Sequence, residues 1–157
     1  MKEQELHNLF ESVYELLKAL ISIPSFSKSE DKTADCIEKF FATYNIPTHR
    51  GMNNVWAFNK FYDASKPTIL LNSHHDTVKP NASYTLNPFE PIEKDGKLYG
   101  LGSNDAGGCL VSLIATFIHF YDKENLNYNL VLAATAEEEI SGVNGIESIF
   151  KKLGPID

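Results

Sequence analysis

Three short segments carry the residue types that metal-assisted hydrolysis needs; they are Ser73–Thr77, Gly100–Gly108 and Glu137–Glu139. A pair of divalent ions takes imidazole and carboxylate ligands and is held about 3.5–4 Å apart by a bridging ligand. In this pattern His74 can supply the imidazole and Asp105 can bridge the ions. Glu139 can bind the second ion, while Glu138 moves the proton. The combination therefore indicates a two-metal site with a general base.

Each segment has an ordinary structural explanation when it is taken alone. A histidine after a strand is commonly structural, an aspartate before a helix commonly caps it, and a run of glutamates commonly faces solvent. Only the occurrence of all three in one chain favours a metal site.

The alternation of side chains along a strand distinguishes the two neighbouring histidines. If the strand direction continues, His74 and Asp76 point to the same side and His75 points to the other. Asp76 can then accept a hydrogen bond from His74, which fixes its tautomer and raises its basicity. The pattern therefore selects His74 as the ligand and leaves His75 without a role. The same alternation points the side chains of Glu138 and Glu139 to opposite sides, so the two residues can have different roles.

Two apolar runs must position the first and third segments. Residues 68–72 (TILLN) and 129–135 (NLVLAAT) predict strands that are covered on both faces, and each is followed directly by one of the polar segments. Ligand sites in open α/β sheets form beyond the carboxyl ends of the strands, so the two segments are expected to meet. Asp105 stands where a loop enters residues 106–121, which are apolar almost all round and predict a buried helix.

The remaining pattern predicts the layers around these strands. Helical spacing predicts a first helix that ends before Pro24, a second over residues 31–44 and a last one that begins near residue 146. A short strand is predicted over residues 55–58, and a hairpin with an Asp-Gly turn over residues 93–99. The expected fold is α/β, a three-layer sandwich with a mostly parallel central sheet, in which residues 1–157 form one unit.

Composition and charge exclude several other classes. A net charge of −7 without a Lys/Arg cluster argues against nucleic-acid binding. The amino terminus lacks the features of a signal peptide, and no apolar run reaches the ~18 residues of a membrane span, so a cytoplasmic location without membrane contact is expected. Cys36 and Cys109 match no metal-binding spacing and are expected to be buried free thiols. Gly107 comes too late for a G-x-G-x-x-G nucleotide-binding loop.

At this point the sequence resembles a known metallohydrolase family, that of acetylornithine deacetylase, succinyl-diaminopimelate desuccinylase and carboxypeptidase G2. The resemblance rests on three signatures that occur in the family's order: His74–Val78, Tyr99–Asp105 and Thr135–Glu139. The segments Ile23–Ser25 and Asn87–Phe89 also match. It covers nearly all of the chain and is closest to acetylornithine deacetylase, an enzyme of arginine biosynthesis. It implies a zinc-exopeptidase-like catalytic domain that removes the acyl group from a small N-acyl amino acid.

The resemblance also implies the role of each site residue. His74 binds one Zn²⁺, Asp105 bridges two, and Glu139 binds the other, with Co²⁺ or Mn²⁺ as substitutes. Asp76 orients His74, and Glu138 is the general base. Two departures, Leu101 in place of an arginine and Asn104 in place of a small residue, remove no ligand.

The family pattern extends beyond the residues present. Its members have a further acidic ligand, a histidine ligand near a distant C-terminus and an inserted dimerisation domain, so residues 1–157 correspond to the N-terminal portion of the catalytic domain. The complete protein is then expected to be a homodimer. The 157 residues alone are expected to bind metal weakly and to be nearly inactive. A dipeptidase or aminopeptidase of the same family, and a binding module that has lost its chemistry, are the alternatives.

Overall fold

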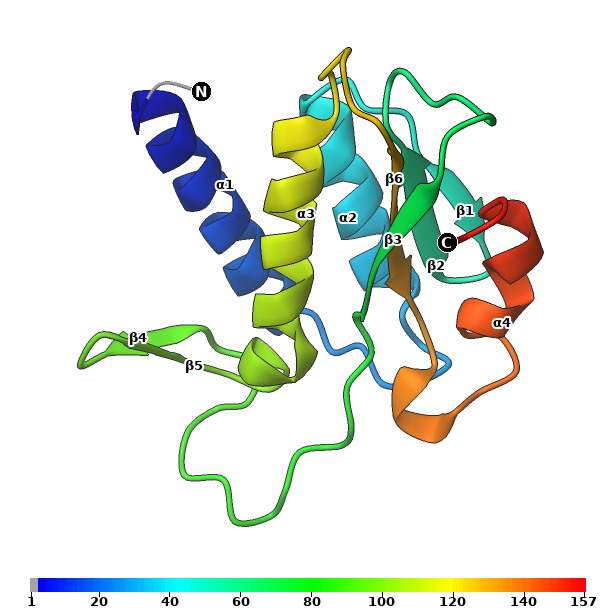
Figure 1. The fold of residues 1–157 in the computed structure, drawn as a ribbon. Helices are drawn as coiled ribbons and strands as arrows, with labels where there is room; N and C mark the ends of the chain where they lie inside the picture. The colour runs from blue at the N-terminus through cyan, green and yellow to red at the C-terminus, as the bar shows by residue number, and fades with distance from the viewer. Residues whose placement is uncertain (1–2) are drawn as a thin grey trace.

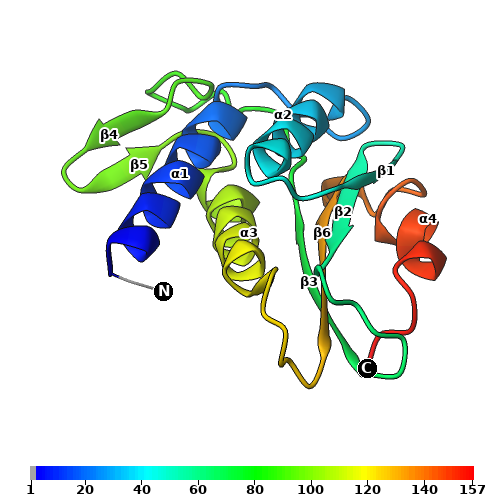
Figure 2. The same ribbon diagram turned by 90° about the horizontal axis from the view of Figure 1, so that it is seen from above.

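The computed structural model describes residues 3–157 as a four-stranded sheet with helices on both faces, beside a separate two-stranded hairpin (Figures 1 and 2). The elements follow in the order α1 (Glu3–Ile21), α2 (Asp31–Thr43), β1 (His49–Gly51), β2 (Asn54–Phe58), β3 (Thr68–His74), β4 (Ile92–Lys94), β5 (Lys97–Tyr99), a π-type turn (Ser103–Gly108), α3 (Cys109–Phe120), β6 (Asn129–Thr135), a 3₁₀ turn (Glu138–Ile140), α4 (Ile146–Ile149) and a second 3₁₀ turn (Phe150–Lys152).

Strand β6 lies at the centre of the fold, and all seven of its residues are buried. Alternate side chains enter two separate apolar cores because successive residues of a strand point to opposite faces. Leu130 and Leu132 pack with helices α1, α2 and α3, whereas Val131 and Ala133 pack with Trp56 and the α4 segment. Figure 2 shows the three long helices on one side of the sheet and α4 on the other. The predicted α/β fold with three layers is therefore confirmed.

The sheet is mixed, with the strand order β1-β2-β6-β3. Of its neighbouring pairs, β3–β6 is parallel, whereas β2 is antiparallel to both β1 and β6, so β2 runs against the other strands of this sheet. The sheet is thus mixed: β2 departs from the expected parallel arrangement, whereas β1, β6 and β3 share one direction. The reason is local: the tight connection around Met52, whose φ is 54°, folds β1 back onto β2 as a hairpin. Strand β1 was not predicted because its three residues carry no alternating pattern.

Strand β3 ends the strand order, and its apolar residues are only partly covered. Ile69 is 43% exposed, and Leu70 and Leu71 are half-buried. The prediction that this strand is covered on both faces is therefore wrong within residues 3–157, whereas the same prediction for β6 is confirmed. The strand is also two residues longer than predicted and ends at His74.

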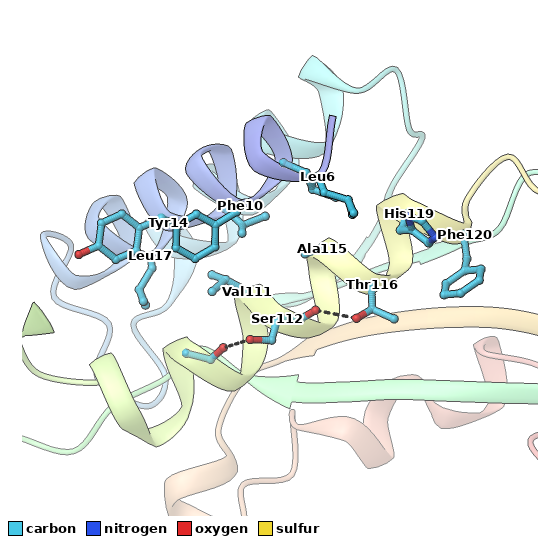
Figure 3. A pocket seen from close by; sticks show the side chains of 13 residues that line it. Leu6, Phe10, Tyr14, Leu17, Val111, Ser112, Ala115, Thr116, His119 and Phe120 are labelled. Carbon is cyan, nitrogen blue, oxygen red and sulfur yellow. Dashed lines mark hydrogen bonds between the residues drawn. The ribbon is translucent and has the colours of Figure 1, made fainter. Parts of the chain in front are cut away.

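Helix α3 begins three residues later than predicted and buries one side only. Its buried residues are Leu110, Val111, Ile114 and Phe117, whereas Ser112 and Thr116 are exposed. The exposed side faces a groove of about 760 Å³ between α1 and α3, which is lined largely by apolar side chains such as Leu6 and Phe10 (Figure 3). The expectation of burial all round is wrong because α1 covers only part of this helix.

Several smaller predictions can also be compared with the structure. Helices α1 and α2 and the β4–β5 hairpin are confirmed, the hairpin having positive φ at Asp95 and Gly96 as its turn requires. Cys36 and Cys109 are both free, but Cys109 is exposed at the start of α3, so its predicted burial is wrong. Within the described part of the chain, no helix combines the length and apolarity needed to cross a bilayer.

Candidate metal centre

The predicted ligands His74, Asp105 and Glu139 lie together at one edge of the sheet. Their nearest ligand atoms all lie within 4.8 Å of one another. His74 is the last residue of β3, paired in register with Thr135 at the end of β6, and Glu139 follows in the 3₁₀ turn after β6. Asp105 comes from the π-type turn before α3, where its peptide bond to the next residue is cis. Three segments that are distant in sequence therefore present imidazole and carboxylate groups to one point.

The two ring nitrogens of His74 face different partners. Nδ1 lies 3.0 Å from the backbone oxygen of Asp76 and 3.4 Å from its carboxylate, so Nδ1–H donates mainly to the backbone carbonyl. Nε2 lies 3.1 Å from Asp105 Oδ1 and 3.5 Å from Glu138 Oε2. With Nδ1 holding its hydrogen, the Nε2 lone pair is directed at the carboxylate cluster, as a metal ligand requires.

The same surroundings favour the protonated imidazole when metal is absent. The Asp76 carboxylate, 3.4 Å from Nδ1, is the largest cause of a raised pKa; burial opposes the rise, and contacts with the Asp76 backbone and with Asp105 add to it. Together they raise the pKa of His74 from 6.5 to about 9. A divalent cation that binds at Nε2 must therefore displace this proton.

The Asp76 carboxylate is fully buried and accepts hydrogen bonds from three groups besides His74. These are the Ser27 hydroxyl (2.7 Å) and the backbone N–H groups of Glu138 (3.0 Å) and Glu139 (3.2 Å). Burial alone would raise the pKa of Asp76, but the hydrogen bonds from His74, Ser27 and the two amides outweigh it and lower the pKa to about 2. The carboxylate thus links the histidine to the segment that carries the glutamates.

The remaining acids of the site crowd like charges around one histidine. The Asp105 and Glu138 side chains are exposed, and Glu139 is half-buried. Burial, followed by the charges of Asp105, Asp76 and Glu138 against the opposing effect of His74, raises the pKa of Glu139. A divalent cation would relieve this repulsion, so one imidazole and two carboxylates with a third carboxylate beside them are a donor set that fits such ions.

His75 lies outside this cluster and is held by structural contacts. Its Nδ1 lies 2.9 Å from the Thr33 hydroxyl, and its Nε2 lies 2.9 Å from the backbone oxygen of Asn53. Burial lowers its pKa to about 4, so the ring is neutral at pH 7, with Nε2–H donating to the Asn53 carbonyl and Nδ1 accepting from Thr33. His75 therefore joins the polar segment to helix α2.

Two residues of the site were missed by sequence analysis. Ser27, which donates to Asp76, lies 49 positions earlier in a loop without any pattern. Glu137 was treated as part of an acidic run, but it is buried and its carboxylate accepts hydrogen bonds from the side chain (2.8 Å) and the backbone (3.3 Å) of Asn144. Only the unbroken apolar run before Glu137 hinted at its burial.

Comparison with known proteins identifies the family of the chain. Residues 70–156, more than half of the chain, match the model of peptidase family M20/M25/M40. The chain therefore belongs to that family. Among curated proteins it is similar to succinyl-diaminopimelate desuccinylase of Buchnera aphidicola (strain Tuc7), with 31% identity over 93% of this chain and 41% of that protein. The same enzyme of Blochmanniella floridana is 31% identical over 88% of this chain and 38% of that protein. The family resemblance predicted from the sequence is confirmed.

Solved structures agree with the fold. The M20 family metallo-carboxypeptidase Sso-CP2 of Sulfolobus solfataricus matches with a TM-score of 0.72 and 26% identity, over 98% of this chain and 36% of that one. Human carnosine dipeptidase 1 matches with a TM-score of 0.64 and 18% identity, over 95% of this chain and 36% of that one, and shares the fold. The chain thus spans about two-fifths of the length of the relatives that it matches.

Proposed function

We propose that the protein is a two-metal amide-bond hydrolase that removes the acyl group from an N-acyl amino acid. The observation that carries this proposal is the convergence of His74, Asp105 and Glu139 within 4.8 Å, with the Glu138 carboxylate 3.5 Å from His74. His74 and Glu139 would each hold one of two Zn²⁺ ions, with Co²⁺ or Mn²⁺ as substitutes, and Asp105 would bridge them. Asp76 would orient His74 through its backbone oxygen and carboxylate.

The chain's residues divide the work of hydrolysis. Divalent ions held by these residues would polarise the scissile carbonyl as Lewis acids and lower the pKa of a water molecule. Glu138 is exposed and is not one of the three clustered ligands, so its carboxylate would be free to accept a proton from a water molecule as the water oxygen attacks the carbonyl carbon. The C–N bond then breaks, and Glu138 returns the proton to the departing amine. The products are a carboxylate and a free amino group.

Two substrates, which differ in their acyl group, are candidates for this reaction. The sequence signatures point to acetylornithine, and the similar curated enzymes are named succinyl-diaminopimelate desuccinylases. Both substrates are N-acylated α-amino acids and need the same chemistry at the amide. The similarity to those enzymes favours the succinylated substrate.

A peptidase of the same family is the second candidate. It is supported by the similarity to the metallo-carboxypeptidase Sso-CP2, which covers nearly the whole of this chain. The attacked bond is again an amide, so the roles of His74, Asp105, Glu138 and Glu139 would be unchanged. The two candidates differ only in the group on the carbonyl side of that bond.

The test is to express the gene product at its natural full length and assay it with Zn²⁺ on N-succinyl-diaminopimelate, N-acetylornithine and dipeptides. Glu138→Gln should reduce kcat at least about 10²-fold because the base is lost, while the metal content stays near that of the native protein. Glu124→Gln, an exposed change in the loop between α3 and β6, is the matched control and should leave both unchanged. Turnover retained by Glu138→Gln would refute the base, and a native protein without bound metal would refute the proposal itself.

A further inference from the structure

Glu30, at the start of α2, is a fully buried carboxylate that neither the sequence signatures nor the cluster of ligands includes. Its two oxygens accept hydrogen bonds from neutral N–H groups. Oε1 accepts from the backbone N–H of Lys28 (2.7 Å) and of Glu137 (3.2 Å), and Oε2 accepts from the side chain of Asn53 (2.7 Å). A carboxylate buried in this way is costly unless its hydrogen bonds are made, so these contacts hold it in one place.

The contact with Glu137 belongs to a series. The backbone N–H groups of three successive residues, 137, 138 and 139, each donate to a buried carboxylate: the first to Glu30, and the other two to Asp76. These amides enter a short 3₁₀ turn, and the first N–H groups of a helical turn have no partner within the turn. We call the two carboxylates Glu30 and Asp76, with the three amides that they bind, the amide clamp.

The clamp acts at the point where the chain leaves the sheet. Strand β6 ends at Thr135, opposite His74, and Glu137 then has a positive φ of 54°. From this point the sheet no longer fixes the direction of the chain. The hydrogen bonds of the clamp then hold the backbone amides of residues 137–139, while Asn54 and Asn144 hold the adjoining Ala136 amide and Glu137 carboxylate.

The start of α2 also holds the other ligand-bearing segment. Thr33, one turn after Glu30, contacts His75 Nδ1 at 2.9 Å. Asn53, which donates to Glu30, lies 2.9 Å from His75 Nε2 through its backbone oxygen. Residues 74–76 and 137–139 are thus fixed to the same few groups around Glu30.

We propose that Glu30 is a positioning residue of the metal centre, which acts through the Glu137 amide to set the distance of Glu139 and Glu138 from His74. The inference rests on the proposed function for its metal, but the clamp itself is a property of the chain. Metal sites require ligand distances within about 0.2 Å of the ideal values, and loss of a group that orients a ligand typically costs 10–100-fold in metal affinity. If Glu30 only stabilised the fold, its removal would lower the free energy of unfolding without a specific loss of metal affinity.

The experiment compares three variants of the protein, expressed at the natural full length of its gene product, in Zn²⁺ titration, denaturant unfolding of the metal-free form and amide hydrogen exchange of residues 137–139. Glu30→Met matches the side chain in length and removes both acceptors. Glu30→Asp keeps the carboxylate but shortens its reach. Ile114→Ala, in the buried core between α3 and the sheet, is the control that lowers stability at a distance from the clamp.

Glu30→Met should raise the Kd for Zn²⁺ about 10–100-fold, and Glu30→Asp at least about 5-fold, with faster exchange of the amides of residues 137, 138 and 139 in both. Ile114→Ala should unfold more easily and keep its Kd within about 3-fold of the native chain, because no clamp contact is changed. If Glu30→Met does not fold, Glu30→Asp decides in the same way.

Three results would overturn the proposal: folded Glu30 variants with the native Kd, exchange that accelerates only at residue 137, or an equal loss of affinity in Ile114→Ala. A native chain that binds no Zn²⁺ would instead count against the proposed function. The exchange pattern of residues 137–139 would then still decide whether Glu30 orders the segment.

Discussion

Asp76→Asn is the change that tests most directly how the site is organised. The substitution keeps the size of the side chain and replaces one carboxylate oxygen by an NH₂ group. The native oxygens accept from the Ser27 hydroxyl and from the amides of Glu138 and Glu139, with His74 Nδ1 3.4 Å away. One of these donors must then face another donor in a fully buried position.

The magnitude follows from two effects. A buried donor that loses its acceptor costs about 1–3 kcal/mol. The negative charge that holds the pKa of His74 at about 9 is also lost, and each pKa unit corresponds to about 1.4 kcal/mol at pH values below the unfolded value of 6.5. Since the His74 backbone contact and Asp105 remain, only part of this shift disappears. We therefore expect the free energy of unfolding to fall by about 2–4 kcal/mol at pH 6.5, with a 10–100-fold loss of Zn²⁺ affinity.

Denaturant unfolding, Zn²⁺ titration and an NMR titration of His74 measure these quantities. Ser27→Ala is the matched control, because it removes one donor to Asp76 and leaves both amides paired, so it should cost only about 1 kcal/mol. If the pKa of His74 stays near 9 in Asp76→Asn, the carboxylate is not its main cause and the reasoning is refuted. Native stability of the variant would likewise refute the cost assigned to the unpaired donor.

The remaining predictions concern stability. Gly142→Ala should destabilise the chain by about 2–3 kcal/mol in denaturant unfolding, because a Cβ at this position would overlap the Glu137 side chain. Gly96→Ala has open space but a φ of 68° and should cost only about 1 kcal/mol, so equal losses in the two variants would contradict the overlap. Stability of the metal-free chain should be greatest near pH 6.5. His75, with its pKa lowered to about 4, contributes stability that is present above pH 6.5 and lost as the pH falls to 4, whereas His74, with its pKa raised to about 9, contributes stability that is present below pH 6.5 and lost as the pH rises to 9. Unfolding measured from pH 4 to 9 should show this maximum. Stability that rises steadily to pH 9 would contradict the assignment of His74, and stability that falls steadily from pH 4 would contradict that of His75.

The sequence by itself determined the α/β class, the helices α1 and α2, the central strand β6 and the order of the three polar segments. These features depend on periodicity and on the position of polar residues after apolar runs, which are local properties of the chain. The selection of His74 over His75 followed from strand alternation, and the structure places these two side chains among different partners.

Only the tertiary structure decided which way the strands run, how far β3 and α3 are covered, and what holds the loop after β6. Strand direction depends on the tight connection between β1 and β2, and burial depends on which elements pack alongside. The groups that orient the site, Ser27 and Glu30, lie 49 positions before Asp76 and 107 before Glu137, in segments whose local sequence gives no sign of these contacts. The donors to a buried carboxylate are set by which distant segments pack against it, and the local sequence around either group does not show that packing.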